Sequence, residues 1–345
     1  MEKINKQIGL YILNYNGVSW LKMNLPNIID YSPSAQIIVI DNNSTDDSIK
    51  YLKTLSEKIE VKKNKLNYGF AKGYNNTLLK EKRFEHFIIM NNDVRVTKGW
   101  IHPLIETMKK KDIGIVQPKI KNFKTTNKKT NIVLSKYFDY AGGAGGFIDL
   151  FGIPFCRGRI INTIEIDKGQ YDINRSIFWA SGCCFMIKRK LFQEIGGFDE
   201  DFFMHQEEID LCWRAQGLNQ KTYFKSESVI YHFGGGTLPY QHPKKTYYNH
   251  RNSLLLIIKN LHFSATLFTI LIKFLIDYCI ILYYLFSGRM KNIFFILLAH
   301  VSFILLLPKF LKKRKAVKPN SMYKGSILID YYLRSKKKFS DLKQF

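Results

Sequence analysis

Acidic residues are scarce in this chain. Its 345 residues include 28 Asp and Glu against 53 Lys and Arg, which gives a formal net charge of +25. Cysteine is scarce as well: the five residues form no C-x-x-C pair and show no zinc spacing, and the adjacent Cys183 and Cys184 are poor disulfide partners. These absences argue against a disulfide framework or a structural zinc site and favour a reducing, cytosolic setting. No separate apolar region precedes the first predicted strand, so we expect no secretory signal.

The excess of basic residues narrows the partners to three classes: nucleic acid, an anionic membrane surface, or phosphorylated small molecules. No basic stripe interleaved with aromatic residues stands out at a helical spacing. We therefore expect no nucleic-acid partner. A basic membrane- or nucleic-acid-binding protein without catalysis is kept as the non-enzymatic alternative.

One short segment concentrates the scarce acids. The stretch GFDEDFFMHQEEIDLCWR holds Asp199, Glu200, Asp201, Glu207, Glu208 and Asp210. From Glu207 onward the pattern predicts a helix with an apolar side. A carboxylate in the first turn of a helix faces the positive end of the dipole, which keeps it ionised and ready to accept a proton. The alternative interpretation is a solvated helix start that only stabilises the dipole.

Residues 1–252 are predicted to form one α/β domain. Strands are expected at 8–14, 37–41, 60–62, 86–90 and 113–117, and helices at 19–29, 46–56, 68–81 and 100–110. This alternation is typical of a doubly wound, mostly parallel sheet, whose ligands bind beyond the carboxyl ends of the strands. The polar residues that directly follow strands are therefore the site candidates: Asn14, Asp41 and residues 91–93.

A lysine-rich stretch, Lys121–Lys129, precedes glycines at positions 142, 143, 145 and 146. A phosphate cradle is one interpretation, but the segment lacks the Lys-Ser/Thr ending of a P-loop. We favour a mobile surface loop over a cleft.

The chain changes character after residue 252. Residues 253–312 are mostly apolar, and residues 313–345 form a basic tail. The run Phe263–Phe286 would reach about 36 Å as a helix, enough for a bilayer core of about 30 Å, whereas Ile293–Leu307 would reach only about 22 Å. Lys273 and Asp277 lie four residues apart, so they can pair on one helix face, and they make lipid-exposed spanning less favourable.

The flanking lysines and these apolar runs favour attachment to an anionic membrane over burial in a soluble core. A spanning hairpin would place Arg289 and Lys291 outside, against the positive-inside tendency, and a pair of interfacial helices avoids that conflict. We expect attachment at the cytoplasmic face. Whether the C-terminal helices span the bilayer or lie on its surface stays open.

Two strand ends suggest a metal site and a base pocket. A carboxylate such as Asp41, followed by turn and helix-cap residues, can accept hydrogen bonds from a uracil or thymine imide or from a ribose. Asp93 beside two amides suits Mg²⁺ or Mn²⁺, which leave positions for substrate phosphates. His232 follows another strand and could complete the site, with Gly234–Gly236 approaching a diphosphate.

At this point the ordered set of motifs resembles a known family. The runs ILNYNG, VIDNNSTDDS, NYGFAKGYN, IIMNNDV and ASGCCFMIKRKLFQEIGGFDEDFFMHQEEIDLCWR are similar to those of family 2 glycosyltransferases with the GT-A fold, and most similar to the rhamnosyltransferase-like bacterial branch. The resemblance covers roughly residues 8–252. It implies a nucleotide-diphosphate sugar donor, a divalent cation, and a lipid-linked or polysaccharide acceptor in cell-surface glycan synthesis.

The resemblance also implies roles for individual residues. Donor-binding positions would be Asn14, Asn16, Asp41, Asn67, Gly69, Phe70, Asn75, Asn92, Ser181 and Gly182. Asp93 and His232 would hold the metal, with the motif Asn91-Asn92-Asp93 departing from the two-aspartate form, so that contact would run through one carboxylate and water. The Glu-Asp motif of the family falls on Glu207-Glu208, and which of the two is the base stays open.

The expected reaction is a single displacement with inversion, in which a carboxylate removes the proton of the acceptor hydroxyl. The absence of Gln-x-x-Arg-Trp disfavours a processive synthase. UDP- and dTDP-sugars are the expected donors, with dTDP-rhamnose one candidate. Nucleotidyl transfer is the alternative enzyme class, but it predicts a glycine-rich loop after the first strand, where this chain has NYNGVSW.

Overall fold

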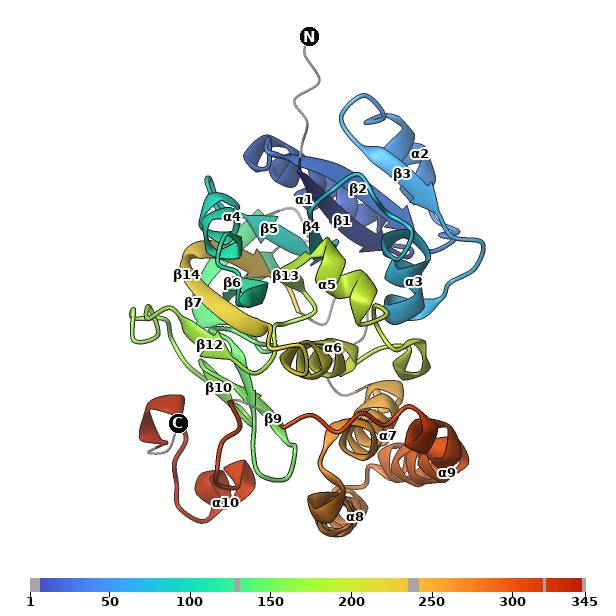
Figure 1. Cartoon of the computed structure of the whole chain (residues 1–345), viewed down its shortest axis with the longest axis vertical. Coiled ribbons are helices and arrows are strands. Elements are labelled where there is room, and N and C mark those ends of the chain that lie inside the picture. The colour runs from blue at the N-terminus through green and yellow to red at the C-terminus, as the bar shows by residue number, and fades with distance from the viewer. Residues whose placement is uncertain (1–6, 127–130, 235–241, 319–320, 343–345) are drawn as a thin grey trace.

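A mixed β-sheet forms the centre of the N-terminal α/β region (Figure 1). The computed structural model describes residues 7–126, 131–234, 242–318 and 321–342. Four parallel strands in the order β3-β2-β1-β4 form its N-terminal half: β1 (Ile8–Asn14), β2 (Ala35–Asp41), β3 (Glu60–Lys63) and β4 (His86–Asn91). Asn14 pairs in register with Asp41, so the polar ends of β1 and β2 meet at one edge.

The second half of the sheet mixes directions. β13 (Cys184–Lys188) runs antiparallel to β4 and to β6 (Ile113–Thr126), and β14 (Lys221–His232) runs parallel to β6. The shorter strands at its margins are β5 (Val94–Val96), β7 (Asn131–Phe138) and β12 (Arg175–Ile177). A separate small sheet contains β8 (Gly146–Ile148), β9 (Pro154–Cys156), β10 (Arg159–Ile160) and β11 (Thr163–Ile164).

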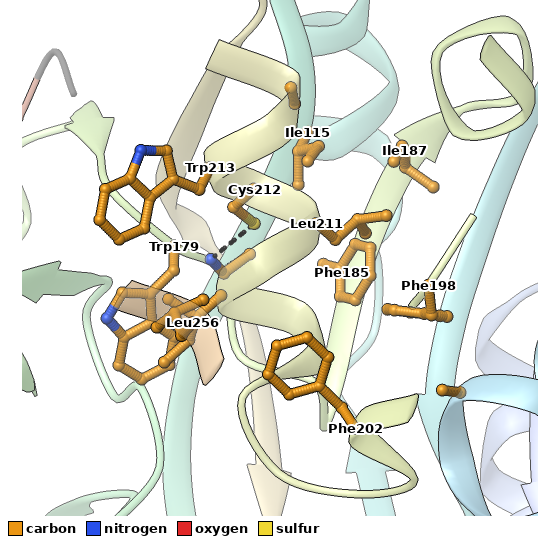
Figure 2. Packing of buried hydrophobic residues seen from close by; sticks show 14 of the residues in the cluster. Ile115, Trp179, Phe185, Ile187, Phe198, Phe202, Leu211, Cys212, Trp213 and Leu256 are labelled. Carbon is orange, nitrogen blue, oxygen red and sulfur yellow. Dashed lines mark hydrogen bonds between the residues drawn. The ribbon is translucent and has the colours of Figure 1, made fainter. Parts of the chain in front are cut away.

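Helices cover both faces of the sheet. They are α1 (Val18–Tyr31), α2 (Ser48–Lys53), α3 (Gly69–Leu78), α4 (His102–Met108), α5 (Arg189–Glu194) and α6 (Glu207–Gln216), with a 3-10 turn at Glu200–Phe202. Figure 2 shows how α6 is anchored: Leu211 lies beside Phe185 on one side of the helix, and Trp213 points to the other side, where its ring packs on Phe178 at 5.1 Å between centroids. The apolar side of α6 thereby fixes the position of its first turn.

Two expectations for this region were wrong. The lysine-rich stretch at 121–129 is not a surface loop over its described part, because residues 121–126 continue β6 and pair with β7; residues 127–130 lie outside the described residues. Phe123 is fully buried, and its apolar contacts outweigh the neighbouring lysines. The helix expected at 46–56 is shortened to Ser48–Lys53, since Asp46 instead accepts hydrogen bonds from the backbone of Val18 and Ser48.

Three long helices follow the mixed sheet and lie below it in Figure 1: α7 (Pro243–Asn260), α8 (Phe263–Phe286) and α9 (Met290–Lys312). The second apolar run, which alone would reach only about 22 Å, is extended by its flanks, because α9 has 23 residues. The division predicted after residue 252 falls inside α7. The division into domains stays a prediction.

Part of the predicted basic tail is packed against the small sheet. This segment includes α10 (Ile327–Tyr332) and a 3-10 turn at Phe339–Asp341. Tyr323 and Phe339 contact Phe155, and all three are buried in one apolar cluster. The sequence analysis considered only the lysines of this tail and did not predict that its aromatic residues would join the core.

Candidate active site

Asn14 joins two of the predicted strand-end groups. Its amide nitrogen donates to Asp41 Oδ1 at 3.0 Å, and its oxygen accepts from the Asn92 amide at 2.8 Å. Asn14 and Asp41 are fully buried. Gly17 permits this arrangement, since a Cβ there would lie 2.2 Å from Asn92 Nδ2. The ends of β1, β2 and β4 therefore form one hydrogen-bonded edge.

The carboxylate of Asp41 organises the turn that follows it. It accepts from the Ser44 backbone N–H at 2.9 Å and from the Ser44 hydroxyl at 2.6 Å. Asn16, in a left-handed conformation, accepts from the Thr45 N–H at 2.7 Å and joins the first loop to this turn. The structure thus brings Asn14, Asn16 and Asp41 together. Direct contact between Asp41 and a base stays a prediction.

The next four predicted donor residues divide into two groups. Asn67 remains near the Asp41 turn, because Asn42 donates to its oxygen at 3.4 Å and to the Gly69 carbonyl at 2.8 Å. Gly69 has φ +71°, and a Cβ there would lie 2.8 Å from the ring and carbonyl oxygen of Phe203. Only glycine therefore allows this close approach between α3 and the segment before α6.

Phe70 and Asn75 face that same segment. The Phe70 ring packs against Phe198 at 5.3 Å between centroids. The Asn75 side chain donates to the Phe198 carbonyl at 2.8 Å and accepts from the Phe198 N–H at 3.0 Å. Both polar atoms of Asn75 are thus engaged in bracing residue 198. We therefore omit Asn75 from the donor site that we propose below.

Asp93 and His232, the two predicted metal ligands, lie in contact. The His232 Nε2 is 3.2 Å from Asp93 Oδ1, and its Nδ1 is 3.2 Å from Asp139 Oδ1. Burial opposes a charge on His232, but the carboxylates of Asp93 and Asp139 hold its pKa well above the usual value. The sequence analysis did not identify Asp139 as a site residue. The one sequence feature that could have indicated it is its position just before the glycines at 142–146. Gly235 and Gly236 lie outside the described residues.

These residues fit a hard divalent cation. Neighbouring ligands of an octahedral ion lie about 3 Å apart, because each ligand distance is about 2.1 Å. The Asp93 and His232 atoms already face each other at that spacing. Asp139 then occupies the place of the carboxylate that commonly orients a histidine ligand. The described residues contain no cluster of three or more ligating side chains, so the remaining positions would belong to water and substrate phosphates.

The acidic cluster separates into two chemical groups. Four of its members are in ion pairs: Asp199 with Lys259 and Lys313, Asp201 with Lys309 and Lys313, Asp210 with Arg214 and Lys259, and Glu200 with Lys72. The other two, Glu207 and Glu208, have no cation partner among the described residues, and each has a buried carboxylate oxygen without a hydrogen bond. Four acids are thus ion-paired, and Glu207 and Glu208 remain as the candidates for proton transfer.

Burial raises the pKa of both carboxyls. The pKa of Glu207 is raised well above its usual value by burial and by the Glu208 charge. Burial raises the pKa of Glu208 to about 7 against the opposing effect of nearby backbone N–H groups, including that of Gly182. A Cβ on Gly182 would lie 3.7 Å from the Glu208 carboxyl carbon, so the predicted Ser181-Gly182 pair borders this site. Ser181 is buried, and its N–H donates to Gln117 at 2.8 Å.

An unusual loop leads into this pair. Phe203, His205 and Gln206 all have positive φ values, a conformation that non-glycine residues seldom adopt. The Asn252 side chain of α7 donates to the carbonyls of Phe202, Met204 and His205 at 3.1, 2.9 and 2.7 Å. One buried amide therefore holds the strained loop in place. No spacing in the sequence marked Asn252 for this contact.

Comparison with known proteins decides the family. Residues 10–196, more than half of the chain, match the model described as "Glycosyl transferase family 2". The chain belongs to this family. The match includes the strand-end residues and the Ser181-Gly182 pair, and it ends before Glu207 and His232, whose roles stay predictions.

Individual relatives are distant. A low-salt glycan biosynthesis hexosyltransferase, Agl10, from Haloferax volcanii is 26% identical over 215 residues, 61% of this chain and 62% of the relative. An N-acetylglucosaminyl-diphospho-decaprenol L-rhamnosyltransferase from Mycobacterium tuberculosis is 32% identical over 89 residues, 26% of this chain and 29% of the relative. The chain thus spans less than two thirds of the length of these relatives.

Solved structures confirm the expected GT-A fold. GalNAc-T7, with UDP, GalNAc and Mn²⁺, has a TM-score of 0.55 at 19% identity, over 71% of this chain and 48% of its own. The mannosyltransferase PcManGT from Pyrobaculum calidifontis, with GDP-Man and Mn²⁺, has a TM-score of 0.52 at 10% identity, over 86% and 87%. At these identities the likeness concerns the fold alone.

Proposed function

We propose that the protein is an inverting, non-processive glycosyltransferase that moves a sugar from a UDP- or dTDP-sugar to a lipid-linked or polysaccharide acceptor in cell-surface glycan synthesis. The observation that carries this proposal is the pair Glu207-Glu208 at the start of α6, two carboxylates that have no cation partner among the described residues and that each keep a buried oxygen without a hydrogen bond. Family membership and the polar edge at Asn14, Asp41 and Asn92 support it. Attachment to the cytoplasmic face of the membrane through the C-terminal helices is part of the same proposal.

Glu208 is the better base of the pair. Glu207 is only 4% exposed, whereas Glu208 is partly accessible and adjoins Gly182. Glu208 would take the proton of the acceptor hydroxyl as the oxygen attacks the anomeric carbon from the face opposite the departing diphosphate. A pKa near the working pH gives a base that is often ionised and still basic enough to be effective. The pKa of Glu207 is raised by burial and by the Glu208 charge, which favours Glu208 as the carboxyl that ionises first.

The donor would bind across the strand ends. Asn16, Asn67 and the exposed side of the Asp41 turn would line the nucleoside pocket, and Asn92 would hold the edge in place through Asn14. Asp93 and His232 would hold Mg²⁺ or Mn²⁺, which neutralises charge on a leaving diphosphate when bound. Nucleotidyl transfer is disfavoured because the first loop carries Asn16 in contact with the Asp41 turn in place of a glycine-rich phosphate loop.

The stereochemistry of the product tests this proposal. Membranes containing the protein would be incubated with labelled UDP- and dTDP-sugars, and the new linkage would be analysed by NMR. We expect one donor to be used, with an anomeric configuration opposite to that of the donor. A retained configuration would contradict the single displacement, and membranes of an Asp93→Ala variant provide the control for background transfer.

The pH dependence of transfer should follow the Glu207-Glu208 pair. Because a protonated carboxyl cannot accept the hydroxyl proton, activity should rise with pH through about 7. Stability should move the other way: a folded pKa above the unfolded value near 4.3 contributes stability at low pH that is lost as pH rises through the folded pKa. A kcat–pH profile tests the first statement. A profile flat from pH 5.5 to 8.5 would contradict the assignment.

Asn252→Asp should weaken both the fold and transfer. The variant replaces a donor by a charged acceptor facing three carbonyl oxygens, at a cost of about 1–3 kcal/mol for the unsatisfied groups. We expect a lower Tm and a lower kcat, with nucleotide affinity little changed. Asn76→Asp is the matched control, because that side chain donates one hydrogen bond, to Asn64. Equal effects of the two substitutions would show that Asn252 does not position the loop.

A further inference from the structure

Helices α8 and α9 expose long apolar faces. Only 28% of the apolar window of α8 and 22% of that of α9 is buried, in contrast to a helix in the core of a soluble protein. The exposed side chains on α8 include Phe263, Leu267, Phe268, Leu271, Leu275, Tyr278, Leu282 and Phe286, and those on α9 include Phe294, Leu297, Val301, Ile304 and Leu305. An apolar face of this length is too large to be ordinary protein surface.

The opposite face of α9 packs along α7, which is itself bound to the loop before α6 through Asn252, and its end reaches the acidic segment. Asn292 donates to Thr246 of α7 at 2.8 Å, and the hydroxyl of Tyr247 donates to Ser302 at 2.8 Å. Near the C-terminal end, Lys309 pairs with Asp201 at 2.7 Å. A helix crossing a bilayer would carry one of its ends about 30 Å away from a domain on one side. The contacts along α9 are incompatible with that separation.

Helix α8 is held in the same way. Its Asp277 lies between two histidines, 2.8 Å from His250 of α7 and 2.8 Å from His300 of α9. Lys273 is buried on the same side of the helix. The expected Lys273–Asp277 pair is thus replaced by a wider polar cluster on the packed face. Lys273 and Asp277, the two charged residues that made lipid contact of this helix unfavourable in the sequence analysis, are buried on the packed face and point away from the exposed apolar face.

The charges around the hairpin favour lipid over a second copy of the chain. Within residues 261–318 the sole acidic residue is Asp277, which is 1% exposed, while basic residues such as Arg289, Lys291, Lys312 and Lys315 stand at the helix ends. Two copies joined through these faces would bring like charges together. An anionic bilayer instead offers an apolar interior and headgroups of opposite charge.

We propose that α8 and α9 lie flat in one leaflet of an anionic membrane, as a monotopic hairpin whose tip and catalytic domain are on the same side. The apolar faces enter the acyl region, and the basic helix ends contact the headgroups. This inference rests on the proposed membrane attachment and is independent of the transfer reaction. It also places α7, and the loop that Asn252 holds, at a fixed height above the leaflet from which a lipid-linked acceptor would be reached.

The position of the hairpin tip tests the proposal. Ser287→Cys places a thiol between the two helices, and Cys279→Ser removes the one exposed native thiol among the described residues. The full chain would be added to preformed vesicles of phosphatidylcholine and phosphatidylglycerol and treated with a membrane-impermeant maleimide. We expect equal labelling of intact and detergent-opened vesicles. Labelling only after opening would show a tip in the lumen and would overturn the flat arrangement.

Vesicle flotation tests the occupant of the apolar face. We expect the protein to float with phosphatidylglycerol-containing vesicles, and Leu275→Glu combined with Phe268→Glu to reduce the floated fraction at least tenfold. Ile173→Glu is the matched control, because Ile173 lies outside the hairpin and is at least as exposed, at 72% against 58% for Leu275. A wild-type protein that stays dimeric and does not float would assign the face to a second copy. Neither readout requires activity, so failure of the transfer reaction would be seen separately.

Discussion

Glu208→Gln should abolish transfer and leave nucleotide binding intact. A positioned base typically contributes 10²–10⁴-fold to the rate, and glutamine cannot take a proton. The substitution keeps the shape of the side chain and removes one of two buried charges that oppose each other, so the fold should be unharmed. We expect kcat to fall by about 10²-fold or more, with unchanged affinity for the metal–nucleotide complex.

Glu207→Gln is the matched control for this variant. This substitution leaves Glu208 in place and replaces a carboxyl whose own pKa is raised by burial and by the Glu208 charge, so turnover should be kept and the pH–rate profile should still rise through about 7. Retained turnover within a few-fold in Glu208→Gln would refute its assignment as the base. If Glu207→Gln is the inactive variant, the two roles are exchanged.

Asp93→Ala should remove metal-dependent donor binding. Asp93 supplies the one carboxylate of its strand-end motif, and His232 alone would hold a divalent cation weakly. We expect loss of bound Mn²⁺ in the presence of nucleotide, measured by electron paramagnetic resonance, and loss of the corresponding thermal shift. Lys62→Ala, on the far strand β3, serves as a control for general damage. Unchanged affinity for the metal–nucleotide complex would show that the cation is held elsewhere.

Much of the fold could be predicted from the sequence, because local patterns determine it. The buried runs at Leu10–Ile12 and Ile37–Ile40 mark strands covered on both faces, and the turn residues after Asp41 mark the exit from the sheet. Side chains at the ends of adjacent parallel strands must meet, so the contact between Asn14 and Asp41 followed from topology.

Contacts between distant segments could not be predicted in this way. Asp139 reaches His232 across a span of 93 residues, and Asn252 reaches the loop before α6 from a helix whose own pattern does not mark this contact. The same limit explains the acidic cluster. Its four ion-paired members and its two unpaired members look alike in sequence, because the cations that pair with them come from α3, α7, α9 and the end of α6.

Asn75 shows where a family resemblance and local geometry differ. The resemblance implied donor contact, whereas both of its polar atoms bind the backbone of Phe198. Gly69 shows the reverse: its motif position has a physical reason in this chain, the close approach of Phe203. Asn75 and Gly69 thus have structural reasons for their identity: they hold the segment before α6 in place through Phe198 and Phe203.

Thermal stabilisation by nucleotides tests the central claim most directly. Detergent-solubilised protein would be heated with UDP, dTDP, GDP or CDP, each with and without Mn²⁺ or Mg²⁺. A ligand at 100 times its Kd adds about 2.7 kcal/mol to the folded state, which is a measurable shift in Tm. The account predicts a metal-dependent shift with UDP or dTDP that is lost in Asp93→Ala and kept in Glu208→Gln. No shift with any nucleotide would contradict it.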